Sequence, residues 1–207
     1  MSDLGFLLRG LAIGLFIAAP VGPIGLLCIQ RTLAHGRTAG LVSGLGAATA
    51  DAFYGAVAAF GVTVVSHALV AEHAWIQAIG GLGLVIIGLQ MTRRPKAHEA
   101  ARSIGGRPLL HYVSVLLLTL ANPMTILSFA AVFAALGPTT ARHTGPAAAL
   151  MVAGVFLGSA LWWLILSTGV SLLRRGLGSS ALRHIAVVAG VAIAALGLAG
   201  VVASGLL

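Results

Sequence analysis

The 207-residue chain is too apolar to be a water-soluble domain. Hydrophobic residues make up 59% of it and charged residues only 8%, whereas a soluble domain carries about a quarter of its residues as charges. The mean hydropathy is +1.07. These values exclude a soluble enzyme, a disordered tail and a disulfide-stapled secreted domain, and they predict a protein that folds in a lipid bilayer.

The net charge of +8 does not indicate a nucleic-acid partner. The basic residues lie in short gaps between long apolar runs and are not interleaved with aromatic residues, so we expect them to set the orientation in the membrane. The single cysteine, Cys28, lies inside an apolar run. It excludes an intrachain disulfide and a multi-cysteine metal site.

Six stretches of about 20 residues contain no Lys, Arg, Asp or Glu, apart from one acid in the second. They are apolar on all faces, which fits helices and not the alternating strands of a membrane barrel. We therefore predict an all-α polytopic membrane protein with six transmembrane helices. The stretches are 10–29, 39–66, 74–92, 112–137, 146–173 and 185–207.

The longest gap divides this single transmembrane domain, residues 1–207, into two halves. Residues 93–111 combine charges with Gly105, Gly106 and Pro108 and read as a flexible cytoplasmic loop. The halves, about 1–92 and 112–207, hold three helices each. Because three is odd, a repeat relating them must be inverted, as in many secondary transporters.

Weak self-similarity supports an inverted 3+3 repeat. The third and sixth stretches align at a fixed offset of 109 residues, which pairs Gly81 with Gly190 and Gly88 with Gly197. Proline also interrupts the first helix of each half, at Pro23 in one and 100 residues later in the other.

These proline breaks are candidate binding elements. Pro20, Gly22 and Pro23 interrupt helix 1, and Asn122-Pro123 interrupts helix 4. A proline inside a helix removes a donor and frees carbonyl groups, which in lipid need another partner. Two breaks near the bundle centre would offer polar groups to a solute, with the Asn122 amide binding a carboxylate or carbonyl. The alternatives are prolines that only kink helices and an amide that only packs.

Asp51 is the second candidate, because it lies well inside the second stretch. An ionised carboxylate at such depth costs about 2.5–3.5 kcal/mol, so we expect it to face a cavity or to be protonated. Tyr54 follows on the same helical face. Together they would present a carboxylate and a hydroxyl, and the carboxylate would pair with an ammonium group or carry a proton. The alternative places Asp51 near an interface, where it caps a half-helix.

Other residues are assigned to packing or lining. Trp162 and Trp163 fall in the middle of the fifth stretch; Trp162 is our candidate to line the cavity. Small residues at four-residue spacing let helices approach closely, and dimerisation through them is open. These stripes are Gly10, Gly14 and Ala18; Gly36, Gly40, Gly44 and Ala48; and Gly154 with Gly158.

We expect neither a metal or cofactor site nor catalysis. The seven histidines lie in gaps or at the ends of stretches, without carboxylate or thiol partners at helical spacing in the membrane. Thr125 and Ser128 have no intramembrane histidine to activate them, and Asp51 has no second carboxylate. The chain is therefore not expected to be an enzyme.

The sequence resembles the lysine exporter (LysE/RhtB) family of bacterial amino-acid efflux transporters over its whole length. One departure is Met124, which follows Asn122-Pro123 where many family members carry a lysine. The resemblance rests on Pro20-Val21-Gly22-Pro23, on His35-Gly36-Arg37-Thr38-Ala39-Gly40 leading to Asp51, on Asn122-Pro123, and on Gly158 with Trp162.

The resemblance implies proton-driven export of an amino acid or related small amine-bearing metabolite. It places Pro23, Asn122 and Pro123 in the broken core and Asp51 at a coupling or substrate-binding position. The expected partners are the substrate, protons and the lipid bilayer, with no nucleic acid. The alternative function is a divalent metal-cation exporter of a related six-helix superfamily, which would need several hard oxygen ligands.

The gaps also predict the orientation. Ten of the 12 Lys and Arg residues lie in the first, third and fifth gaps, so the positive-inside rule places these gaps in the cytoplasm. Both termini then lie on the outer side of the bacterial inner membrane.

A C-terminal fusion tests this topology. Alkaline phosphatase fused after Leu207 should be active, because its disulfides form outside the cytoplasm, whereas the same enzyme fused after Arg102 in the third gap should be inactive. Phosphatase activity in intact cells is the measurement, and an inactive C-terminal fusion that is stably produced would contradict the prediction.

Overall fold

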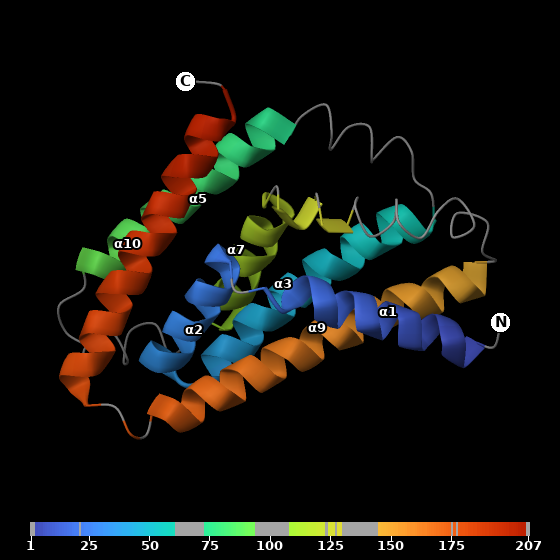
Figure 1. The fold of residues 1–207 in the computed structure, drawn as a ribbon, viewed down its shortest axis with the longest axis horizontal. Coiled ribbons are helices and arrows are strands. Elements are labelled where there is room, and N and C mark those ends of the chain that lie inside the picture. Colours follow the sequence, from blue (N-terminus) through green and yellow to red (C-terminus); the bar gives the residue numbers. More distant parts are fainter. Residues whose placement is uncertain are drawn as a thin grey trace.

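The computed structural model describes the chain as helices, and no strand occurs among the described residues, so the all-α prediction is confirmed. The described residues are 3–20, 22–60, 73–93, 108–122, 124–126, 128–129, 145–174, 176 and 178–205. The helices (Figure 1) are α1 (Asp3–Ala18), α2 (Pro23–His35), α3 (Arg37–Ala59), α5 (His73–Arg93), α7 (Pro108–Leu120), α9 (Gly145–Arg174) and α10 (Ser179–Ala203).

Three described helices are long and apolar enough to cross a membrane: Arg37–Ala59, Gly145–Arg174 and Arg183–Ala203. A fourth span results if α1 and α2 form one bent span. Shorter apolar helices lie at Gln77–Gln90, within α5, and at Pro108–Leu120. The described part of the chain thus accounts for three or four spans of the predicted six.

The predicted break in the first stretch is confirmed. Helix α1 ends at Ala18, α2 begins at Pro23, and the two helices are bent by 81°. Proline at the first helical position is favourable, since the N–H that it lacks would have no partner there. Helix α2 then continues to His35, beyond the predicted end of the stretch at residue 29.

Two predicted gaps are shorter in the structure. Only Gly36 separates α2 from α3, and its φ of 92° is a conformation that glycine adopts without a steric penalty. Arg31, which we placed in the gap, therefore belongs to a helix. Residues 108–111 of the predicted cytoplasmic loop are also helical, because Pro108 starts α7; residues 94–107 lie outside the described residues.

Helix α3 is the centre of the bundle and packs against α2, α7 and α9. Helix α1 lies alongside α9, while α5 and α10 form a second pair that meets the rest mainly through α2 (Figure 1). The central core contains buried side chains of α2, α3, α7 and α9, among them Leu27, Cys28, Val115 and Trp163.

The small-residue stripes lie at helix contacts, as predicted, apart from Gly36, which separates α2 from α3. A Cβ atom added at Gly14 would lie 2.1 Å from the carbonyl oxygen of Val155, and one at Gly158 would lie 2.0 Å from that of Leu11. Backbone therefore touches backbone where α1 runs parallel to α9. Such contacts allow dispersion and packing to hold helices together in lipid, where the hydrophobic effect contributes little.

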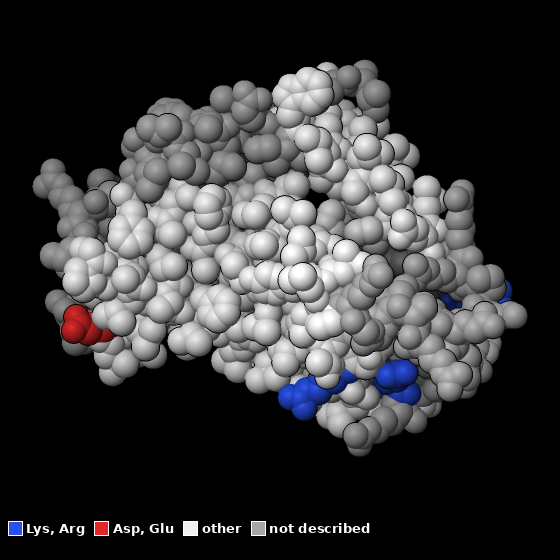
Figure 2. Space-filling view, turned by 180° about the vertical axis from the view of Figure 1, so that it is seen from behind, with Lys and Arg blue, Asp and Glu red and all other residues white. Residues whose placement is uncertain are grey.

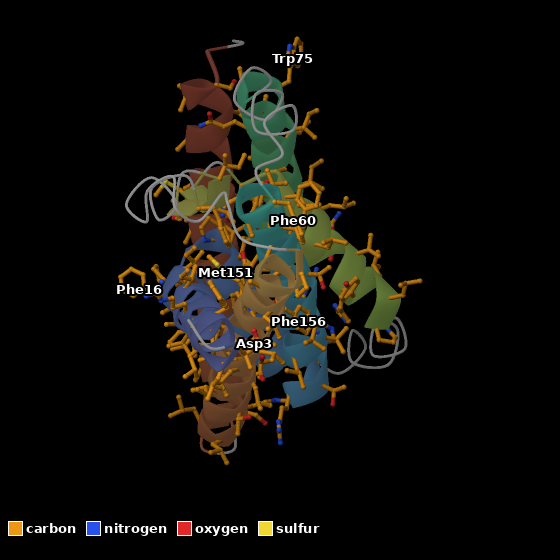
Figure 3. All side chains as sticks on the ribbon, turned by 90° about the vertical axis from the view of Figure 1, so that its right-hand side faces the viewer. Asp3, Phe16, Phe60, Trp75, Met151 and Phe156 are labelled. Carbon is orange, nitrogen blue, oxygen red and sulfur yellow. The ribbon has the colours of Figure 1, made fainter. Side chains whose placement is uncertain are left out.

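The outside of the molecule is apolar. Phe16 is 75% exposed and Trp75 60% exposed, and both project away from the helices (Figure 3). On the face drawn in Figure 2, the Lys, Arg, Asp and Glu side chains lie near the margins. This surface fits a lipid environment, in which charged groups gather near the ends of the spans.

Substitution of glycine in α9 tests the packing. Gly158→Ala should destabilise the protein by about 1–3 kcal/mol, because the new methyl group meets backbone that cannot yield. Gly169→Ala is the matched control: nothing lies within 4 Å of its added Cβ, and alanine favours the helix. Thermal unfolding in detergent, followed by tryptophan fluorescence, measures both; equal melting temperatures would contradict the packing.

Candidate functional site

The Asp51 carboxylate lies between α3 and α9 and is only 3% exposed. Ser159 of α9 donates a hydrogen bond from Oγ to Asp51 Oδ2 at 2.7 Å. The indole Nε1–H of Trp163 in turn donates to Ser159 Oγ at 3.1 Å. Asp51 lies in the interior of α3 and so caps no helix end. Its position inside a helix agrees with the sequence, while the expectation that it faces a cavity or is protonated stays a prediction.

Close packing of α3 against α9 positions the residues of this hydrogen-bond chain. Ser159 and Trp163 are four residues apart and share one face of α9. Gly44 faces the base of the indole, since an added Cβ there would lie 2.3 Å from the Trp163 Cβ. A larger residue at position 44 would push α9 away from α3 and separate Ser159 from Asp51.

The tryptophan that reaches the site is Trp163, which is 5% exposed. Trp162, our candidate from the sequence, is half-buried and packs against the central core. Ser159 was not a candidate at all. Its spacing of four residues from Trp163 was the signal that could have identified it.

Tyr54 is 3% exposed, and its hydroxyl donates to the carbonyl oxygen of Leu120, the last residue of α7. It therefore does not point its hydroxyl proton at Asp51. In a continuous helix the N–H of Met124 would donate to that carbonyl. Tyr54 takes the place of the missing backbone donor.

Asn122 supplies the complementary bond at the same break. Its Oδ1 accepts a hydrogen bond from the Met124 N–H at 3.1 Å, and its main-chain oxygen accepts from the N–H of Thr125 at 3.1 Å. Asn122 thus caps the turn that follows α7, as asparagine does at helix starts. Pro123, the other predicted residue of this break, lies outside the described residues.

A small apolar cluster connects the two breaks. Its buried members are Tyr54, Phe129 and Val155. Ile17, just before the first break, packs against it, and so does Ile126, just after the second. The break residues Pro20, Gly22 and Pro23 thus follow a helix end that contacts the same cluster as the break at Asn122.

The chemistry of the site rests on one carboxylate with one hydroxyl donor. Such a group can carry a proton or pair with an ammonium group. Within the described ranges, no three His, Cys, Asp or Glu side chains come together to hold a metal ion.

Tyrosine substitutions test the role of Tyr54 at the break. Tyr54→Phe should cost about 1–3 kcal/mol, because it leaves the partly buried Leu120 carbonyl without this donor. Tyr112→Phe should cost less, about 0.5–1.5 kcal/mol, because Tyr112 donates to the Thr49 hydroxyl, which keeps its own bond to the Leu45 carbonyl. Thermal unfolding in detergent measures both, and an equal loss in the two variants would argue against a special role for Tyr54.

Comparison with known proteins identifies relatives along most of the chain. Residues 15–204 match the family described as "LysE type translocator". The chain is 32% identical over 176 residues, 81% of its length and 78% of the relative's, to "Uncharacterized membrane protein YahN" of Escherichia coli (strain K12). It is 26% identical over 191 residues, 90% of each chain, to "Putative amino acid efflux protein YcgF" of Bacillus subtilis (strain 168). No solved structure matches. The chain belongs to the LysE type translocator family.

Proposed function

We propose that the protein is a secondary active transporter that exports an amino acid or related small amine-bearing metabolite in exchange for protons. The observation that carries the proposal is the buried Asp51 carboxylate, which has a serine hydroxyl as its hydrogen-bond donor. Among the described residues, no Arg, Lys or His forms an ion pair with it. A buried acid without a fixed cation is suited to exchange a proton for a cationic group of the substrate.

The relatives support the substrate class. The family consists of translocators, and the name of the Bacillus subtilis relative specifies amino acid efflux. An amino acid carries the ammonium group that a carboxylate such as Asp51 would bind. A divalent cation would need several oxygen ligands, and Asp51 is the only buried acid among the described residues.

We also propose the six-span inverted repeat as the architecture, and the helix contacts support it. Helix α1 runs parallel to α9, and α7 runs parallel to α3, because Tyr112 contacts Thr49 and, further along both helices, Leu120 contacts Tyr54. Exchanging the two halves converts one pair of helices into the other. The contacts of Gly81 with Gly197 and of Gly88 with Gly190 are likewise exchanged by the 109-residue offset. Two halves related by a twofold axis in the membrane plane would produce this exchange of contacts.

In this scheme, transport alternates the access of Asp51 between the two sides of the membrane. Protonation removes the charge of Asp51, so the site without substrate can change from one side of the membrane to the other. An ammonium group displaces the proton and compensates the charge on the return. The broken helices offer places where the bundle can bend with few backbone bonds to exchange, because Tyr54 and Asn122 already satisfy one break.

The exchange of Asp51 for asparagine tests the proposal. Asp51→Asn keeps the volume but removes the titratable group, so gradient-driven efflux should fall below about a tenth of wild type. Asp3→Asn is the control, because Asp3 lies in the first, exposed turn of α1, and it should transport normally. The measurement is efflux of a labelled amino-acid mixture from proteoliposomes with an imposed pH gradient. Wild-type efflux that is insensitive to the gradient, or unchanged in Asp51→Asn, would refute proton coupling through Asp51.

A further inference from the structure

The Arg31 side chain of α2 points into the bundle and forms hydrogen bonds with α3 and α7. From α2, its Nη1 donates to Ser43 Oγ of α3 at 3.0 Å and to the His111 carbonyl oxygen of α7 at 2.8 Å. Its Nη2 donates to Ser114 Oγ of α7 at 2.8 Å. The guanidinium group is thereby fixed in position and orientation.

All three acceptors are neutral, so none compensates the charge of Arg31. Of the described acids, Asp3 and Asp51, neither forms an ion pair with it. Glu72 and Glu99 lie outside the described residues. A largely buried cation without an anion is unfavourable, which makes this position receptive to an anionic ligand.

The three hydrogen bonds also determine which edge of the guanidinium group remains available for a ligand. Ser114 Oγ and the His111 carbonyl oxygen lie 3.2 Å apart. This spacing suits two acceptors that bind the distal hydrogens of Nη2 and Nη1, which point away from the rest of the side chain. The second Nη1 hydrogen bonds Ser43. Within the described residues, the remaining donors are Nε–H and the adjacent Nη2–H, and this edge binds a carboxylate through two parallel hydrogen bonds.

The surroundings of Arg31 are basic. His35 lies one turn further along α2, and its ring centroid is 5.5 Å from that of His111. The Nη1 atom of Arg174 lies 3.6 Å from where a Cβ of Gly36 would be. These groups make this end of the bundle attractive to anions.

We propose that Arg31 binds the carboxylate of the exported amino acid through its Nε–Nη2 edge. The inference rests on the proposed function, and the topology proposed above places this position at the cytoplasmic end. Ser43, which holds Arg31, precedes Asp51 by eight residues on α3, a rise of about 12 Å. The α-ammonium and α-carboxylate of one amino acid are too close together to reach Asp51 and Arg31 at the same time, so Arg31 binds the substrate before it moves on to Asp51.

The test compares an acid with its amide. The purified full-length protein in phosphatidylcholine nanodiscs is titrated with each common L-amino acid, and binding is read from the thermal shift of tryptophan fluorescence. The carboxamide of the tightest binder should bind about 10- to 100-fold more weakly, because it loses a charged bidentate contact. This comparison needs no variant and does not depend on whether substitutions fold.

Variants assign the effect to Arg31. Arg31→Lys keeps the charge but not the two-pronged edge, so it should bind the acid about tenfold more weakly and no longer distinguish it from the amide. Arg37→Lys is the matched control at the exposed start of α3 and should bind as wild type does.

Several outcomes would overturn the inference. They are equal binding of acid and amide by wild type, wild-type discrimination in Arg31→Lys, and no thermal shift with any amino acid. Loss of binding when phosphatidylglycerol is added would assign the edge to a lipid phosphate. Destabilisation by Glu99→Gln as large as that by Arg31→Lys, with discrimination intact in both, would assign it to an internal ion pair.

The same data separate this inference from the proposed function. Efflux with equal binding of acid and amide would refute only the role of Arg31. Discrimination that depends on Arg31, without efflux of any amino acid, would refute only the exporter.

Discussion

The close packing of α3 against α9 is the constraint on which the site depends, because it brings the Ser159 hydroxyl to the Asp51 carboxylate. An acid at this depth persists only if it is protonated, hydrogen-bonded or paired with a cation. Gly44 provides the space for Trp163 beside it, and Gly14 and Gly158 bring α1 against the other side of α9. The glycine content and the buried acid are therefore parts of one arrangement, in which close backbones bring a single donor to a single carboxylate.

The helix breaks are subject to the same constraint as Asp51, that buried polar groups need hydrogen-bond partners. In lipid, each carbonyl and N–H that a proline frees needs a partner within the protein. At the end of α7, Tyr54 and Asn122 provide these partners. Both residues were expected to contact substrate, and both first serve the backbone. A substrate that enters this region has to exchange bonds with them, which would couple its arrival to bending of the helices.

The sequence predicted the helical class, the first break and the position of Asp51 inside a helix, because each depends on local composition. Long charge-free runs define helices, prolines define their interruptions, and an acid flanked by apolar residues has few other places to lie. It did not identify Ser159, since the spacing of four residues from Trp163 becomes informative only when α3 is placed beside α9 and brings Asp51 to the serine. The choice between Trp162 and Trp163 depended on the rotation of α9, which local composition does not determine. Arg31 was assigned to a gap because its charge ended the apolar run, whereas the helix continues and the charge is held by oxygens from α3 and α7.

The central claim is that Asp51 holds either a proton or the ammonium group of the substrate. Proton release on substrate binding measures this most directly, with purified protein in weakly buffered detergent and a pH indicator. Saturating substrate should release up to about one proton per chain from wild type and none from Asp51→Asn, because binding and protonation of one group are linked. Substrate binding to wild type without proton release, or equal release from Asp51→Asn, would contradict the account.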